Sequence, residues 1–387
     1  MLFGIFVVLL SAILFYFILN LEVFTGLEIS GFLKFILIVV EMIIVGKLLS
    51  KRYKLDTEIG LILLKSKKGL EFIEKISQYK KLWNFLADVG TTISYGVIGA
   101  FLMRKNTRWY TFTAGIILLA CLIFFIAPLA LAFLSTVLAG SVFEDGPAMD
   151  LGDESITAIF LLVVTFLGGF FLSLMVGLVY YGVYILTLVF QFIFLGSSDL
   201  LATQPGGTLL LPGVNLPFVE GILALVMVLV VHEGAHAILS RIAAVPLKSS
   251  GIVLFGIIPI GAFVEPDENV LRGTPQREQT RVLVGGSTAN FLTSIVCFAL
   301  FIPVALLLHS LEAGTILYGI FRFIYIVLGL SFSLNFIVAT VNLLPLPLFD
   351  GFRILEVNIP KKIIVNALMY ITLIAFLLNF LPWLFAK

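Results

Sequence analysis

The residues best suited to chemistry are His232, Glu233 and His236, in the run His-Glu-Gly-Ala-His of a chain that has only three histidines. Residues four apart lie on one face of a helix, so the two imidazoles can bind a single Zn²⁺. The carboxylate of Glu233 is then placed to take a proton from a water molecule at the metal. This pattern predicts peptide hydrolysis at a zinc centre, with Glu233 as the general base.

A catalytic zinc normally has three protein ligands, so a third must come from elsewhere in the chain. Asp350 is the best candidate, because it follows an apolar span and is expected at the same membrane depth as His236. The acidic residues at 265–268 lie on the same side but are typical of a solvated loop. Two histidines that only hydrogen-bond within a helix bundle remain the alternative, although ionisable clusters in membrane segments are costly and usually functional.

The composition is that of a membrane protein, with 60% hydrophobic and 12% charged residues and a mean hydropathy of +1.15. A soluble protein of 387 residues does not need so much apolar surface for its core. The net charge is +1, and no single basic patch suggests a nucleic-acid partner. We therefore expect an all-α polytopic membrane protein whose surroundings are the lipid bilayer.

About nine transmembrane helices are expected from the apolar runs. They are 1–20, 32–49, 111–139, two spans within 156–195, 221–240, 282–308, 315–341 and 362–386. The run 156–195 is too long for one span, so we expect a hairpin that turns near Tyr180-Tyr181-Gly182. The stretch 85–103 is interrupted by polar residues and is expected to be interfacial or re-entrant.

The charges predict the orientation. Loop 50–81 carries nine Lys or Arg residues, whereas 140–155 carries five acidic residues and no basic one. The positive-inside rule places the first loop in the cytoplasm and the second outside. We therefore expect a multi-pass protein of the cell membrane whose active site faces the cytoplasmic side, with the segment 65–83 lying on the inner membrane surface.

A β-hairpin is expected next to the zinc site. The segment 251–262 is rich in β-branched residues, is bounded by glycines and is too broken for a helix. An exposed strand edge would offer main-chain donors and acceptors to a substrate segment that has unwound. The candidate substrate-binding residues in this hairpin are Gly251, Ile257, Gly261 and Ala262.

Two motifs together resemble a known family. The run 232–236 and the pattern Asn342-x-x-Pro345-x-x-x-x-Asp350-Gly351 look like the paired signature of site-2 proteases, which are intramembrane zinc metalloproteases. Residues 261–268 and 286–290 are similar to stretches of the archaeal and animal branch. The resemblance covers about 215–358. It departs from the family pattern at Ser287, where a proline is usual, and at Phe349, where a leucine is usual.

The resemblance implies one Zn²⁺ per chain, held by His232, His236 and Asp350, and transmembrane proteins as substrates. It implies cleavage near the cytoplasmic side in regulated intramembrane proteolysis. Asn290 and Asn342 match asparagines of the catalytic core, where an amide could donate to the developing oxyanion. Hydrogen bonding between helices in lipid is the alternative role for these amides.

The expected organisation is an N-terminal transmembrane region (1–214), a catalytic core (215–358) and a C-terminal transmembrane helix (359–387), with no PDZ or CBS domain. Two other functions stay open. One is a catalytically inactive zinc-binding homologue. The other is a different membrane-embedded metallopeptidase, which would need a glutamate as its third ligand. Glu312 is expected outside, and Glu356 does not lie in the required context.

Overall fold

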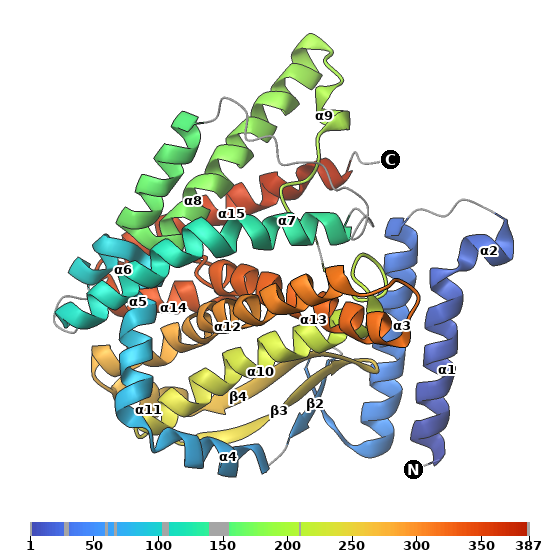
Figure 1. Ribbon diagram of the computed structural model, residues 1–387, viewed down its shortest axis with the longest axis horizontal. Coiled ribbons are helices and arrows are strands. Elements are labelled where there is room, and N and C mark those ends of the chain that lie inside the picture. Colours follow the sequence, from blue (N-terminus) through green and yellow to red (C-terminus); the bar gives the residue numbers. More distant parts are fainter. Residues whose placement is uncertain are drawn as a thin grey trace.

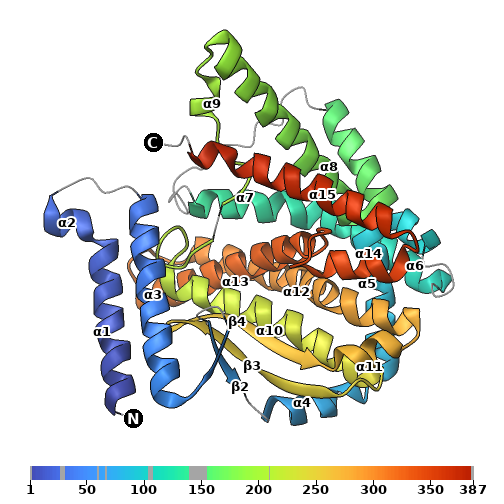
Figure 2. The same cartoon turned by 180° about the vertical axis from the view of Figure 1, so that it is seen from behind.

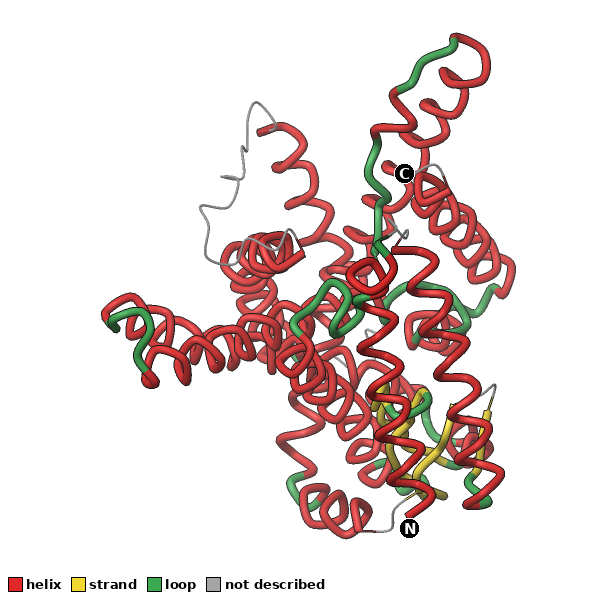
Figure 3. Tube along the Cα trace, turned by 90° about the vertical axis from the view of Figure 1, so that its right-hand side faces the viewer, coloured by secondary structure: helices red, strands yellow, loops and turns green. Residues whose placement is uncertain are grey.

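The computed structural model describes residues 2–26, 31–58, 61–65, 68–102, 108–138, 155–208 and 210–384. Long apolar helices make up most of it, and the strands gather at the end of the molecule that also holds the N-terminus (Figures 1 and 3). The N-terminal half contains α1 (Leu2–Leu19), α2 (Leu21–Thr25), α3 (Gly31–Tyr53), β1 (Asp56–Glu58), β2 (Leu61–Lys65), α4 (Lys68–Ser77), α5 (Lys80–Leu102), α6 (Trp109–Cys121), a π-helical turn (Leu122–Ile126), α7 (Ala127–Leu138), α8 (Ser155–Leu195) and α9 (Asp199–Ala202). The C-terminal half contains α10 (Phe218–Ile242), β3 (Leu247–Phe255), β4 (Ile258–Pro266), α11 (Glu268–Gly273), α12 (Gln276–Ser310), α13 (Ile316–Val341), α14 (Asp350–Asn358), α15 (Lys362–Phe380) and a 3₁₀ turn (Leu381–Leu384).

The predicted hairpin is confirmed as part of a larger antiparallel sheet. The strand order is β1-β2-β3-β4, and β3 and β4 form the hairpin. Strands β1 and β2 come from the loop after α3, where the sequence predicted no strand. Lys65 of β2 pairs with Gly251 of β3, so the N-terminal region closes one edge of the hairpin and leaves β4 at the other edge.

The tip of the hairpin meets the N-terminal helices. A side chain at Gly256 would lie 2.5 Å from the sulfur of Met42 on α3, so the tip packs directly on that helix. Ile257 and Phe255 pack on the apolar cluster that α1 and α3 form around Met42. Figure 2 shows the sheet lying along α10, with α3 at the end of the hairpin. The hairpin is therefore held between α10 and the N-terminal helix pair of α1 and α3.

Six helices in the described part of the chain are long and apolar enough to cross a membrane, fewer than the nine that the sequence predicted. They span Trp109–Leu138, Ile159–Leu195, Phe218–Ile242, Gln276–Ser310, Ile316–Val341 and Lys362–Phe380. Helix α1 is apolar but short. Helix α3 carries Lys34, Glu41 and Lys47, which reduce its apolar character. Glu41 is buried there and accepts a hydrogen bond from Ser11 of α1.

The turn predicted near Tyr180-Tyr181-Gly182 is wrong, because α8 is helical there and departs from helical geometry at Gly169 instead. Gly169 has φ 64° and ψ −167°, and α5 has a matching break at Gly96, with φ 58° and ψ −150°. The two glycines lie backbone to backbone, since a Cβ on Gly96 would lie 2.5 Å from the nitrogen of Gly169. Only glycine allows both the positive φ and the close approach.

A buried ion pair joins α5 to α12. Arg281 donates to both carboxylate oxygens of Asp88 at 2.7 Å, and Arg277 donates to the same carboxylate at 3.0 Å. Asp88 and Arg281 are both buried. Removing one partner of a buried ion pair typically costs about 3–5 kcal/mol, because the other charge is left uncompensated. Two turns along α12, Thr288 touches Gly90 of α5 so closely that no side chain would fit there.

Candidate metal centre

Helix α10 carries the histidines and ends in a way that directs the chain into the sheet. Ala244 follows the helix with φ 60°, a left-handed conformation. The N–H of Ala244 donates to Arg241 O at 3.1 Å, and the N–H of Val245 donates to Ser240 O at 2.9 Å. This pair of bonds is the Schellman pattern, which ends helices by reversing the chain. As a result β3 begins at Leu247, and the hairpin returns along α10.

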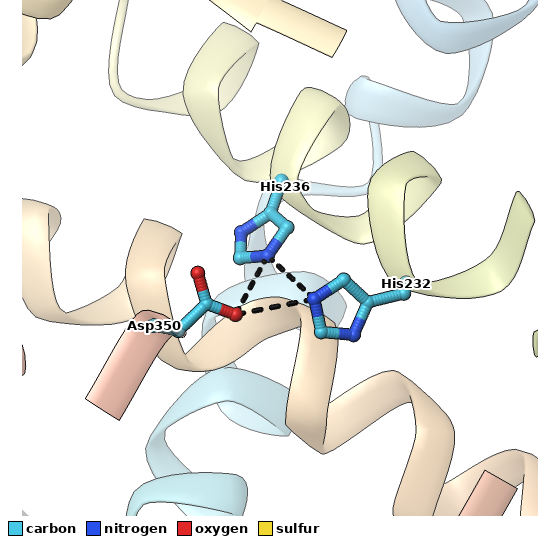
Figure 4. Close-up of side chains that lie close together, drawn as sticks. All are labelled: His232, His236 and Asp350. Atoms are coloured by element: carbon cyan, nitrogen blue, oxygen red, sulfur yellow. Dashed lines mark hydrogen bonds and ion pairs between the residues drawn. The ribbon is translucent and has the colours of Figure 1, made fainter. Parts of the chain in front are cut away.

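The structure brings His232, His236 and Asp350 together, the three residues predicted as ligands (Figure 4). The Nε2 atoms of the two histidines lie 3.1 Å apart, and each lies 3.1 Å from Oδ2 of Asp350. The edge of a tetrahedron with metal–ligand bonds of ~2.0–2.1 Å is about 3.3 Å, so three donor atoms at this spacing fit Zn²⁺. In the described part of the chain, no other cluster of three or more His, Cys, Asp or Glu residues has this spacing.

The rings are oriented from behind so that Nε2 faces the metal position. Nδ1 of His236 lies 2.7 Å from Val282 O, so it carries the proton and leaves the Nε2 lone pair free. Nδ1 of His232 lies 3.2 Å from the amide nitrogen of Asn290, whose buried oxygen has no hydrogen-bond partner among the described residues. A half turn of this carboxamide lets the oxygen accept the Nδ1 proton. Asn290, predicted as an oxyanion donor, therefore lies against the ring of His232, a candidate ligand.

Two glycines let α12 approach the histidines. A Cβ on Gly286 would lie 2.5 Å from ring atoms of both His232 and His236, so any side chain there would fill the metal position. A Cβ on Gly285 would lie 2.4 Å from the Leu239 side chain. The pair therefore acts through close backbone approach, and Gly286 forms the floor of the site.

Asp350 is aimed by the turn that precedes α14. The N–H of Gly351 donates to Asn342 O at 2.8 Å, and a Cβ on Gly351 would lie 2.0 Å from Leu343 O. The side chain of Asn342 donates to Val338 O at 3.1 Å, within its own helix. Burial would raise the pKa of Asp350, but the two imidazoles outweigh it and hold this pKa well below its ordinary value. Asp350 is therefore ionised, as a metal ligand must be.

Glu233 links the metal centre to the sheet. The N–H of Val264 on β4 donates to Oε2 of Glu233 at 3.2 Å. This bond shows that the Val264 N–H points away from β3. Because backbone groups alternate in direction along a strand, those of Ala262 also point away from β3. The edge of β4 that faces away from β3 therefore lies next to Glu233, the predicted general base.

The other predicted residues are spread along the hairpin. Gly251 lies inside the sheet, between Lys65 and Phe263, so it is not at an edge. Ile257 is at the hairpin tip and packs on the N-terminal helices. The acidic residues at the end of β4 and directly after it are engaged apart from the metal centre. Glu265 accepts from Ser249, Asp267 caps α11, and Glu268 pairs with Arg353.

Comparison with known proteins identifies this region. Residues 220–382 match the model of peptidase family M50, which begins at α10 and includes all three candidate ligands. This region is similar to peptidase family M50. The resemblance to the site-2 proteases is thereby confirmed for these residues, and the family is one of metallopeptidases. The M50 match also takes in all of α15, beyond the core of 215–358 that the sequence suggested.

One curated relative of the M50 region is an uncharacterized protein of Methanocaldococcus jannaschii. It is 33% identical over 121 residues, which cover 28% of this chain and 33% of the relative. The chain thus spans about a third of the length of the curated relative that it matches. No solved structure matches this chain.

Several residues around the M50 site were not singled out by the sequence. The sequence did carry a signal for Asp88 and Arg281, since charged residues in apolar segments are rarely without a partner. Strand β2 had a weak one, because Leu61–Leu64 is an apolar run within a basic loop. The sequence carried no signal for the carbonyl of Val282, because any residue can supply a backbone carbonyl.

Proposed function

We propose that this protein is an intramembrane zinc metalloprotease that hydrolyses peptide bonds of transmembrane helices. The observation that carries the proposal is the convergence of three ligand atoms at 3.1 Å with a glutamate that bonds to a free strand edge. The first part is the ligand set of a catalytic zinc, which needs three protein ligands and an open position. The second part places a general base where an extended substrate can reach it.

The residues divide the reaction between them. When zinc is bound, it supplies a Lewis acid that polarises the carbonyl and lowers the pKa of water. Glu233 accepts a proton from the attacking water as the oxygen–carbon bond forms. As the carbon–nitrogen bond breaks, Glu233 returns that proton to the leaving amine. Val282 and Asn290 hold the imidazole rings during these steps.

The edge of β4 is the proposed docking surface for the substrate. A transmembrane helix has bonded all of its backbone groups internally, so it must unwind before its peptide bond is accessible. An extended segment can then add to the sheet beside Gly261 and Ala262. Strand β2 already adds to the opposite edge of the hairpin, over Leu61–Lys65. Along that edge, β2 of the same chain thus already occupies the place of an added strand.

The cytoplasmic orientation is part of the proposal. Helix α4 packs Ile73 on Ala237 and Ile238, next to the metal centre, and leaves Phe72 exposed. The described basic residues of the segment 50–81 therefore lie at the same end of the molecule as the site. By the positive-inside rule this end faces the cytoplasm, from which water can enter.

The proposed activity is tested with the full chain purified in detergent and reconstituted in liposomes. We expect about one zinc per chain and cleavage of a co-reconstituted single-span substrate, inhibited by a chelator and restored by zinc. Mass spectrometry of the products locates the cut within or near the apolar segment. A protein that binds zinc but cleaves none of a panel of helix substrates would favour the inactive homologue, and cleavage confined to soluble peptides would favour another metallopeptidase class.

Ala262→Pro tests the docking edge. Proline has no N–H to donate, so we expect turnover of a helix substrate to fall by about 10-fold or more, for the loss of one hydrogen bond of ~1.5 kcal/mol. Zinc content and melting temperature should stay near wild type, because this N–H does not pair with β3. Ala262→Ser is the matched control, since it keeps the N–H and should retain activity. Full turnover in the proline variant would show that the substrate docks elsewhere.

A further inference from the structure

Helix α14 carries the third candidate ligand at its start and a buried asparagine at its end. Asp350 is its first residue and Asn358 its last, with Ile354 midway between them. This spacing of four and eight residues places all three on one face of the helix. At ~1.5 Å per residue the helix is about 12 Å long, so Asn358 can act on the metal position only through the helix itself.

The carboxamide of Asn358 is buried and hydrogen-bonded on both sides. Its Nδ2 donates to Ile354 O at 2.8 Å, within α14, and to Oγ1 of Thr280 at 3.0 Å, on α12. Its Oδ1 accepts from Nε2 of Gln276, one turn earlier on α12, at 3.1 Å. Thr280 in turn donates to Gln276 O at 2.9 Å. The end of α14 is therefore joined to the first turns of α12 by a closed set of bonds.

The other contacts of α14 leave this task to Asn358. Ile354 and Leu355 are buried in the apolar core, and apolar contacts have no preferred direction. Arg353 pairs with Glu268, but both side chains are largely in contact with solvent, where ion pairs contribute little. Hydrogen bonds are directional. The bonds of Asn358 therefore fix how α14 is rotated about its axis and where it lies along α12.

Helix α12 also fixes the two histidines. Val282, two residues after Thr280, accepts from Nδ1 of His236 at 2.7 Å through its backbone oxygen. Gly286, one turn further on, lies directly against both imidazole rings. One helix thus holds the histidine side of the metal centre and, through Asn358, the helix that begins with Asp350.

We propose that Asn358 is a positioning residue that holds the carboxylate of Asp350 at zinc-binding distance from His232 and His236. This inference rests on the proposed zinc protease function. Metal–ligand distances are held within about 0.2 Å, so a small rotation of α14 is enough to weaken the site. The competing role for a buried asparagine is to stabilise helix packing, as amides between helices in lipid do.

Asn358→Leu tests the inference in the full-length protein purified in detergent. Leucine keeps a side chain of similar volume but has no polar atoms. Gln276 is exposed and can turn to water, and Thr280 keeps its bond to Gln276 O. We expect zinc affinity, measured by competition with a chelator, to fall by about 10–100-fold, as for loss of an outer-shell partner. In protein loaded with Co²⁺, the visible absorption band should shift, because it reports the geometry of the ligands.

The double variant Asn358→Leu/Thr280→Val separates positioning from stability. Removing both partners of a buried hydrogen bond can be nearly neutral for stability, so the melting temperature should lie near that of wild type. Zinc affinity should stay low, because the new apolar contact does not fix the rotation of α14. If Asn358→Leu does not fold, the double variant supplies the same measurement. Zinc affinity that recovers together with the melting temperature would show a role in stability alone and would overturn the inference.

Asn379→Leu is the matched control. Asn379 is also buried, donates to Ala375 O within α15 and to Leu178 O of α8, and has no contact with α12 or α14 among its described bonds. Its loss should lower the melting temperature and leave zinc affinity and the Co²⁺ band unchanged. Wild-type zinc affinity in Asn358→Leu, or an equal loss in Asn379→Leu, would overturn the inference while the protease function stands. A wild-type chain that binds no zinc would remove the proposed function and the inference with it.

Discussion

Glu233→Gln is expected to abolish cleavage while the protein keeps nearly one zinc per chain. The amide cannot accept the proton of water, and a general base contributes about 10²–10⁴-fold to the rate. Glu233 is not among the three ligands that meet at 3.1 Å, so its loss leaves the metal position intact. His232→Ala and His236→Ala should lose zinc and activity together. Zinc content by mass spectrometry and cleavage of a helix substrate are measured on the same samples.

The control for this prediction is Glu220→Gln, in the first turn of the same helix. It should behave as wild type in both measurements. Equal loss of zinc in Glu233→Gln and the histidine variants would contradict the assignment of Glu233 as the base. Retained cleavage in Glu233→Gln would move the base to another residue.

Asp350→Ala is expected to remove the third ligand and with it most zinc binding. Loss of an outer-shell partner typically costs about 10–100-fold in metal affinity, so loss of a ligand should cost more than 100-fold. The two histidines would then face each other without the carboxylate that lies 3.1 Å from each. Competition with a chelator of known affinity measures the change in zinc binding, and cleavage should be lost in parallel.

Glu265→Ala and Asp267→Ala are the matched acidic controls. Glu265 accepts from Ser249 on the neighbouring strand, and Asp267 accepts from the first N–H groups of α11. Neither lies at the metal centre, so zinc affinity should stay at its wild-type value. The reverse ranking of Asp350 and these two residues would place the ligand at the end of β4 or directly after it.

The hairpin shows what local sequence can and cannot predict. Its glycines and β-branched residues favour strands, and β3 and β4 form where they are expected. The same reasoning could not show which edge is free, because that depends on β2, which lies far away in the sequence. Gly251 therefore lies inside the sheet, whereas Ala262 lies at its edge.

The long apolar run of α8 also shows what local sequence can and cannot predict. Its length indicates a break, and its composition suggested one near Gly182. The break occurs at Gly169, because that glycine meets the backbone of α5 at Ser94 and Tyr95. This contact depends on how α5 and α8 pack together, so it cannot be predicted from the sequence of either helix alone.

The local sequence predicts the metal-binding chemistry. A spacing of four residues places His232 and His236 on one helix face, and this geometry is local to the helix. It also determined the membrane character, since apolar composition depends on no contact. Folding is what brings Asp350 to the two histidines and what requires Gly286 to lack a side chain. Those relations join residues that are far apart in the chain, and they exist only once packing has brought their helices together.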